Sequence, residues 1–450
     1  MMKCFLSLNR TVFGMLLLAQ LSFAHSAGFL DIYQDARLGD PQYAAAKAEW
    51  DAAKTLLPQA IGQLLPQIAL SGSRINNDIT NETHSSLRGT QSTDYQFTSK
   101  NGTLNLSQAL IRPQAWINFL QSRDQIRQAD EQLRLAKQEL ILRLAQAYFD
   151  ALLAEDNVAL AAEQKAAISE QLKQAKRYFQ AGVGTITDIN EAQARYDTIV
   201  AQELAVQNNL EIKIRAIEQL VGKVYSNISP LGPRLALESP DPASVEQWLA
   251  FSLANNPQLK AREASFDVSQ QEVYKNMAAH LPTLDLVASK GRSESPGFTL
   301  IDNVTSSNTV GIQLSVPIFS GGTTHARVNQ ASALKERARY ELEATKRAIL
   351  QSTRQEYLNI VNGVAQVKAL EQAVKSNELA LYSAKKGQEA GLRTSFDVLN
   401  TQQLLFSAKR DLAQERYRYV LSRLKLRAAA GLLDEDDVVL VQYWLVKSSE

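Results

Sequence analysis

The chain has 450 residues, with 48 Lys or Arg against 47 Asp or Glu, so its formal net charge is +1. Nucleic-acid binding needs a basic surplus, so this balance argues against nucleic acid as a partner. The single cysteine, Cys4, excludes a disulfide framework, and the four histidines lack metal-ligand spacing. No phosphate-binding or dinucleotide motif is found, and we expect no enzymatic activity, cofactor or resident metal.

Residues 1–24 have the pattern of a secretory signal peptide, because Lys3 and Arg10 precede an apolar run that ends in small residues. We expect cleavage after Ala24; cleavage after Ala27 and an uncleaved anchor are the alternatives. No later segment has the ~18 consecutive apolar residues of a membrane helix. A mature chain that crosses a membrane would therefore do so as β-strands closed into a barrel.

The remaining chain is a tandem duplication. Matching residues recur in the same order in both halves: Tyr148 with Tyr357, Gly182 with Gly391, Asp188 with Asp397, and Gly222 with Gly431. The expected divisions are a first repeat at 25–222, a linker at 223–245, a second repeat at 246–431 and a C-terminal segment at 432–450.

Each repeat begins with a shorter helix and two strands. X-Pro pairs at Leu65–Pro66 and Leu281–Pro282 end the first helices. Residues 310–318 alternate between apolar and small or polar side chains, as a strand with one apolar face does. Extra residues rich in Asn, Ser and Thr in the first repeat predict loops near 79–93 and 292–307.

A very long helical hairpin completes each repeat. Residues 114–181 contain no Gly or Pro and are rich in helix-forming residues, which predicts a helix ~100 Å long. A turn at 182–184 leads into a second helix at 185–221. The second repeat has the same pattern, with helices at 323–386 and 392–430 and a turn at 387–391. Thr185 and Thr394 stand where the N-caps of the returning helices are expected.

The chain has only four predicted strands, which cannot close a membrane barrel. Open edges in lipid are forbidden, so several copies must combine, and three copies would supply twelve strands. The apolar stripes of the long hairpins also need neighbours, which repetition around an axis provides.

The sequence resembles the TolC family of bacterial outer-membrane export channels over essentially the whole mature chain. The motifs that carry the resemblance are 31–38, 281–286, 317–322, Thr187-Asp188-Ile189, and 390–394 with 397–399. The resemblance implies a homotrimer, with a twelve-stranded barrel in the outer membrane continued by an α-helical barrel across the periplasm. The fold class is thus mainly α with a β-barrel portion, and the hairpin turns at Gly182, Gly184 and Gly391 would form an entrance that is closed at rest.

The resemblance also implies a gate at these turns. Arg393 would contact Thr187 and Asp188 across neighbouring hairpins, and Asp397 would face the pore, where three carboxylates could bind multivalent cations. The family pattern has a second acidic residue where this chain has Asn400, and a tyrosine where it has Gln388. We therefore expect one acidic ring. Asp188 and Asp397 also fit a purely structural role in the first turn of a helix.

The implied function is an exit duct for type I protein secretion, multidrug efflux or both. Its partners would be a periplasmic adaptor protein, an inner-membrane pump of the ABC or RND type, and outer-membrane lipid. Two alternatives are a periplasmic adaptor, which would carry one hairpin and small β-domains, and a coiled-coil scaffold. The signal peptide, the two hairpins and the matched strands favour the channel.

Overall fold

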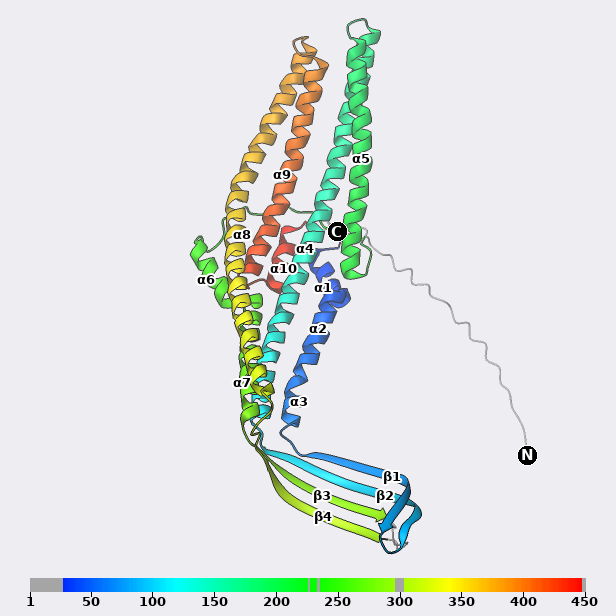
Figure 1. The fold of residues 1–450 in the computed structure, drawn as a ribbon. Helices are drawn as coiled ribbons and strands as arrows, with labels where there is room; N and C mark the ends of the chain where they lie inside the picture. Colours follow the sequence, from blue (N-terminus) through cyan, green and yellow to red (C-terminus); the bar gives the residue numbers. More distant parts are fainter. Residues whose placement is uncertain (1–26, 226, 233–234, 296–302, 447–450) are drawn as a thin grey trace, which may run out of the picture.

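The computed structural model describes residues 27–225, 227–232, 235–295 and 303–446. The expected signal peptide at 1–24 lies outside the described residues. Two long helical hairpins extend toward one end of the molecule, a β-sheet lies at the other end, and short helices surround the middle (Figure 1).

The same order of elements occurs twice, as the duplication predicts. The first set is α1 (Phe29–Gly39), α2 (Pro41–Lys54), α3 (Leu56–Gly62), β1 (Gln67–Ser85), β2 (Gly89–Ile111), α4 (Pro113–Gln180) and α5 (Ile186–Val221). The second set is α6 (Val245–Asn255), α7 (Pro257–Met277), the 3₁₀ turn η1 (Ala278–His280), β3 (Thr283–Ser295), β4 (Asn303–Ser315), α8 (Thr323–Glu389) and α9 (Ser395–Ala429), followed by α10 (Glu435–Trp444).

The helix starts are determined locally in both sets. Asp40 caps α2 by accepting hydrogen bonds from the backbone N–H groups of Gln42 and Tyr43, and Pro41 follows it. Asn256 caps α7 by accepting from the N–H of Leu259, with Pro257 after it. Proline suits the first helical position because its missing N–H would have no partner there.

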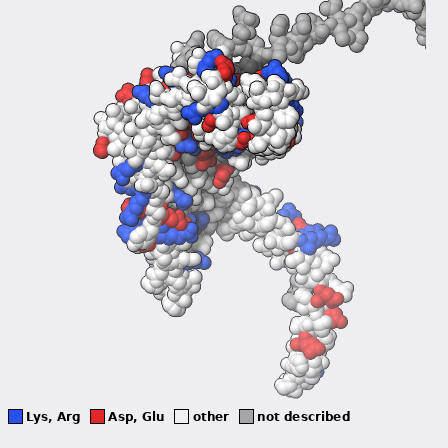
Figure 2. All heavy atoms as spheres, turned by 90° about the horizontal axis from the view of Figure 1, so that it is seen from above, with Lys and Arg blue, Asp and Glu red and all other residues white. Residues whose placement is uncertain are grey.

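The four strands form one antiparallel sheet in the order β1-β2-β3-β4, so β1 and β4 are its open edges. Directly opposite residues share a face. The register therefore gathers apolar side chains on one face: Ile68, Leu70, Leu104, Leu106, Leu284, Leu286, Val310, Ile312 and Leu314. The other face carries small polar residues such as Ser71, Thr103, Ser289 and Thr309. When the molecule is viewed from above, the sheet extends as an arm away from the helical body (Figure 2).

The loop predicted near 79–93 is much shorter than expected and spans only 86–88, because β1 continues to Ser85 and β2 begins at Gly89. Backbone pairing continues to the Ser85–Gly89 pair, and the hydroxyl of Thr80 donates to Asp94 at 2.7 Å. The polar side chains of residues 79–93 show no alternating pattern, so the sequence did not predict strands there. Strand pairing also depends on the partner strand. Of the second predicted loop, residues 292–295 and 303–307 are also strand, and 296–302 lie outside the described residues.

The strand predicted at 310–318 ends at Ser315, shortly before Pro317, which has no N–H for a strand ladder. The helix predicted to end at residue 386 continues to Glu389, so Gly387 lies in its last turn. Among the described helices, none combines the length and apolar character needed to cross a membrane.

The main hydrophobic core lies at mid-height, where α1 and α10 pack against the long helices. Phe29 meets Tyr148 edge to face, with ring centres 5.3 Å apart. The hydroxyl of Tyr148 donates to the Ser229 carbonyl at 2.7 Å, which ties the 223–245 segment to the core. The C-terminal segment lies beside the 223–245 segment at the same height, because the N–H of Gly232 donates to the Trp444 carbonyl at 2.8 Å.

Candidate channel entrance and adjoining groove

The turn of the first hairpin is built from glycine and a capped helix start. Gly182 adopts a left-handed conformation with φ of 76°, and the N–H groups of Val183 and Gly184 both donate to the Tyr178 carbonyl. Thr185 then caps α5, since its hydroxyl accepts from the N–H of Asp188 at 3.2 Å. The N-cap predicted at Thr185 is confirmed.

The second turn repeats this design. Gly391 has φ of 75°, and the N–H groups of Leu392 and Arg393 donate to the Gly387 carbonyl. Thr394 caps α9 by accepting from the N–H of Asp397 at 3.2 Å, as predicted. Both turns are therefore closed by a Thr–Asp capping box, in which each side chain bonds the other residue's backbone.

The carboxylate of Asp397 is largely occupied within its own turn. It accepts from the backbone N–H and the hydroxyl of Thr394, both at 2.9 Å. Arg393 lies farther away, with Nη1 3.8 Å from Asp397 Oδ1. The bonds from Thr394, assisted by the charge of Arg393, hold the pKa of Asp397 below its ordinary value. The side chain is therefore ionised at neutral pH.

The remaining predicted gate residues lie in the helix ends beside the same two turns. Thr187 and Asn400 are exposed, while Gln388 is half-buried. Asn400 is three residues after Asp397 and so shares its helix face. Among the described residues of a single chain, no hydrogen bond or ion pair joins Arg393 to Thr187 or Asp188.

A side-chain link between the two hairpins was not predicted from the sequence. Arg195 on α5 donates to Gln403 on α9, and its guanidinium carbon lies 5.8 Å from the centre of the Phe396 ring. Local patterns carry no signal for this link, because its partners are 208 residues apart in the chain.

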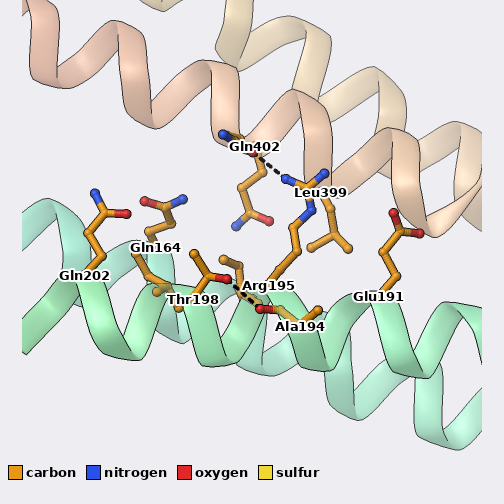
Figure 3. A pocket seen from close by; sticks show the side chains of 11 residues that line it. Gln164, Glu191, Ala194, Arg195, Thr198, Gln202, Leu399 and Gln402 are labelled. Atoms are coloured by element: carbon orange, nitrogen blue, oxygen red, sulfur yellow. Dashed lines mark hydrogen bonds between the residues drawn. The ribbon is translucent and has the colours of Figure 1, made fainter.

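The link crosses a groove of about 430 Å³ between α4, α5 and α9 (Figure 3). Glu191, Thr198 and Gln202 line it from α5, and Leu399 and Gln402 line it from α9. Leu399 is 2% exposed because it packs among Ile168, Leu172 and Ile199. This small apolar cluster fixes the distance between the hairpins near their ends.

The chain matches a family model twice, at residues 32–223 and 248–432, and the model is described as "Outer membrane efflux protein". Both repeats are thus covered, including both hairpins and both strand pairs. The protein belongs to the outer membrane efflux protein family.

Several curated proteins are similar over most of their length. The alkaline protease secretion protein AprF of Pseudomonas aeruginosa is 35% identical over 96% of this chain and 90% of its own. The proteases secretion protein PrtF of Dickeya chrysanthemi is 32% identical, with 94% and 92% covered. The outer membrane protein TolC of Vibrio cholerae is also 32% identical, with 91% and 92% covered.

Solved structures share the fold. The outer membrane protein VceC of Vibrio cholerae superposes with a TM-score of 0.77 at 20% identity, covering 90% of this chain and 96% of that one. The Campylobacter jejuni CmeC outer membrane channel gives 0.78 at 18% identity, covering 93% and 90%.

The chain is therefore an export channel of the bacterial outer membrane with a large periplasmic part, as the resemblance implied. It is a transport protein by family. The adaptor alternative finds no support, because the family match takes in the second hairpin and the second strand pair.

Proposed function

We propose that three copies of this chain form one continuous duct whose barrel crosses the outer membrane. The observation that carries this proposal is the sheet, which has open edges at β1 and β4 and an exposed apolar face. Leu70 is 81% exposed and Val310 is 80% exposed on that face. Lipid would cover these side chains, and edge-to-edge pairing of three sheets would satisfy the open strands.

The helices support the same assembly. Apolar side chains of the long helices are exposed in the single chain, as with Leu204 at 64%, Leu379 at 66% and Leu404 at 57%. Packing against neighbouring copies would cover such stripes, so six hairpins around one axis would make the wall of the periplasmic tunnel.

The division of the chain follows from this assembly. Residues 25–222 and 246–431 are the two repeats, and each supplies one hairpin and two strands. Segments 223–245 and 432–450 form a collar around the middle of the tunnel. The bond between Val446 and the Pro230 carbonyl, at 2.9 Å, supports their association.

The hairpin turns form the periplasmic entrance in this proposal. Arg393 contacts Thr187 and Asp188 of an adjacent hairpin and keeps the entrance closed, and Gln388 borders that contact. Asp397 and Asn400 line the narrowest ring, which holds three carboxylates. Channel recordings test this ring: Asp397→Ala should lower the cation preference of the pore and weaken block by multivalent cations. An unchanged cation preference would remove Asp397 from the constriction.

The proposed cargo is secreted protein, delivered by an inner-membrane ABC pump through a periplasmic adaptor. The names of two of the relatives, at 35% and 32% identity, refer to protease secretion. Efflux of small toxic compounds by an RND-type pump is the second candidate, since a solvent efflux pump protein of Pseudomonas putida is 24% identical over 56% of this chain.

Deletion of the gene in its own bacterium tests the cargo. We expect secreted proteins to disappear from the medium and to return with the unmodified gene. Loss of dye and solvent efflux with unchanged protein secretion would overturn the protein cargo in favour of small compounds.

A further inference from the structure

Four basic side chains gather near the middle of the sheet. They are Arg74 on β1, Lys100 on β2, and Lys290 and Arg292 on β3. All four are exposed. Figure 2 shows positive charge partway along the arm and negative charge nearer its tip. We call these four residues the basic patch.

The strand register places the basic patch on the apolar face of the sheet. Arg74 pairs directly with Lys100, four residues beyond the pair Leu70–Leu104. Lys290 pairs with Leu104 itself. Because side chains alternate along a strand, residues two apart point the same way, and these cations border the apolar belt on its turn side.

Glycines leave room between the basic side chains. Arg292 pairs with Gly102, which pairs in turn with Gly72. A methyl group added to Gly102 would meet nothing within 4 Å, and one added to Gly72 would meet only the Asn101 carbonyl at 3.8 Å. The row between Leu70–Leu104 and Arg74–Lys100 therefore has no side chain on β1 or β2, and on β3 Arg292 projects from it.

The charge of the basic patch is only partly balanced. Glu294 lies 2.9 Å from Arg292 and 3.5 Å from Lys100. Arg74 and Lys290 take part in none of the ion pairs found in the described part of the chain. Four cations against one carboxylate leave a positive surplus beside a surface that must contact hydrocarbon.

We propose that the basic patch binds the phosphate groups of the outer-leaflet glycolipid. This inference rests on the proposed duct, in which the helices extend into the periplasm and the strand turns point outward. The patch then lies at the outer boundary of the hydrocarbon, where lipid phosphates lie. Arginine and lysine bind phosphate by charge-assisted hydrogen bonds, and basic clusters at membrane boundaries recognise anionic headgroups. The acyl chains of the same lipid cover Leu70 and Leu104.

The test is lipid titration of the full-length protein in detergent, followed by native mass spectrometry. The probes are lipid A and its dephosphorylated form. We expect lipid A to bind at least roughly tenfold more tightly than the dephosphorylated lipid. The variant with Arg74, Lys100, Lys290 and Arg292 all changed to Gln should lose most of this preference. A variant with Lys100→Arg and Lys290→Arg, which keeps the charge, should retain it.

A second control removes exposed cations elsewhere, by Arg337→Gln and Arg347→Gln on α8, and should leave lipid A binding unchanged. Equal binding of the two lipids, or an unchanged preference in the four-Gln variant, would overturn the proposal. Oligomeric state and channel conductance are measured on the same samples. Normal values with unselective lipid binding reject the lipid site alone, whereas a monomer without conductance rejects the duct.

Discussion

Asp397 and Thr394 hold each other at the start of α9, because the carboxylate accepts from the Thr394 N–H and hydroxyl while that hydroxyl accepts from the Asp397 N–H. Asp188 and Thr185 repeat the arrangement at the start of α5. The acid predicted to face the pore is thus also a structural part of its turn. Any substitution at Asp397 changes the cap as well as the charge.

Thr394→Val should loosen the second turn. The variant loses the cap, and we expect amide exchange in the first turn of α9 to accelerate roughly fivefold. The pKa of Asp397 should rise toward its ordinary value, because the hydroxyl that helps to lower it is gone. Hydrogen–deuterium exchange measures the first effect, and Thr185→Val should confine the same effect to α5.

The pH dependence of this turn follows from the lowered pKa of Asp397. A carboxyl group whose pKa is lower in the folded state stabilises that state above the unfolded pKa. The stabilisation is lost as pH falls through the folded pKa. Protection of the first-turn amides of α9, corrected for the intrinsic pH dependence of exchange, should therefore persist at neutral pH, and its loss should set in only below the ordinary range of a carboxyl group. An onset near pH 6 would contradict this assignment.

Arg393→Ala separates a gate role from a local one. Within one chain the Arg393–Asp397 distance is 3.8 Å between exposed groups, a contact that contributes little to stability. We expect unchanged folding but a higher resting conductance, because the proposed contact with an adjacent hairpin is lost. Arg177→Ala removes an exposed ion pair of α4 with Glu170 and is the control. Equal conductance in the two variants would exclude Arg393 from the gate.

Much of this fold follows from local signals. Gly182, Gly391, Thr185 and Thr394 were recognisable because turn and cap chemistry is encoded within a few residues. Strand pairing across 79–93 was not, since it depends on a partner strand rather than on residue type. The Arg195–Gln403 link joins distant parts of the chain and was also missed. Whether Asp397 faces the pore depends on how neighbouring copies are arranged, which local sequence does not encode.

Gly431→Ala should destabilise the protein much more than Gly222→Ala. Both glycines are left-handed, with φ of 72° and 74°, so alanine costs about 1–2 kcal/mol at either site. At Gly431 the added carbon would also lie 2.3 Å from the Asn255 carbonyl oxygen, whereas at Gly222 it would meet nothing within 4 Å. Thermal unfolding should rank the variants in this order. Equal shifts in melting temperature would mean that the backbone at Asn255 moves away to make room for the added methyl group.

Buried Tyr417 and half-buried Asp156 form a pair that makes stability depend on pH. The tyrosine hydroxyl donates to the carboxylate at 2.8 Å, yet burial still raises the pKa of Asp156 above its ordinary value. The free energy of unfolding is therefore highest below the unfolded pKa and falls as pH rises through the folded one. Asp156→Asn should reduce this pH-dependent fall in the free energy of unfolding. Tyr417→Phe should destabilise the protein by about 1–3 kcal/mol at neutral pH, because it leaves the carboxylate unpaired.

A chain with four strands becomes a duct only by combining with two further copies. The mass of the detergent-solubilised mature protein, measured by native mass spectrometry with lipid and detergent removed, tests this most directly. We predict a single species of three chains. A monomer or a dimer would leave the edges of β1 and β4 without partners in lipid and would rule out the trimeric duct.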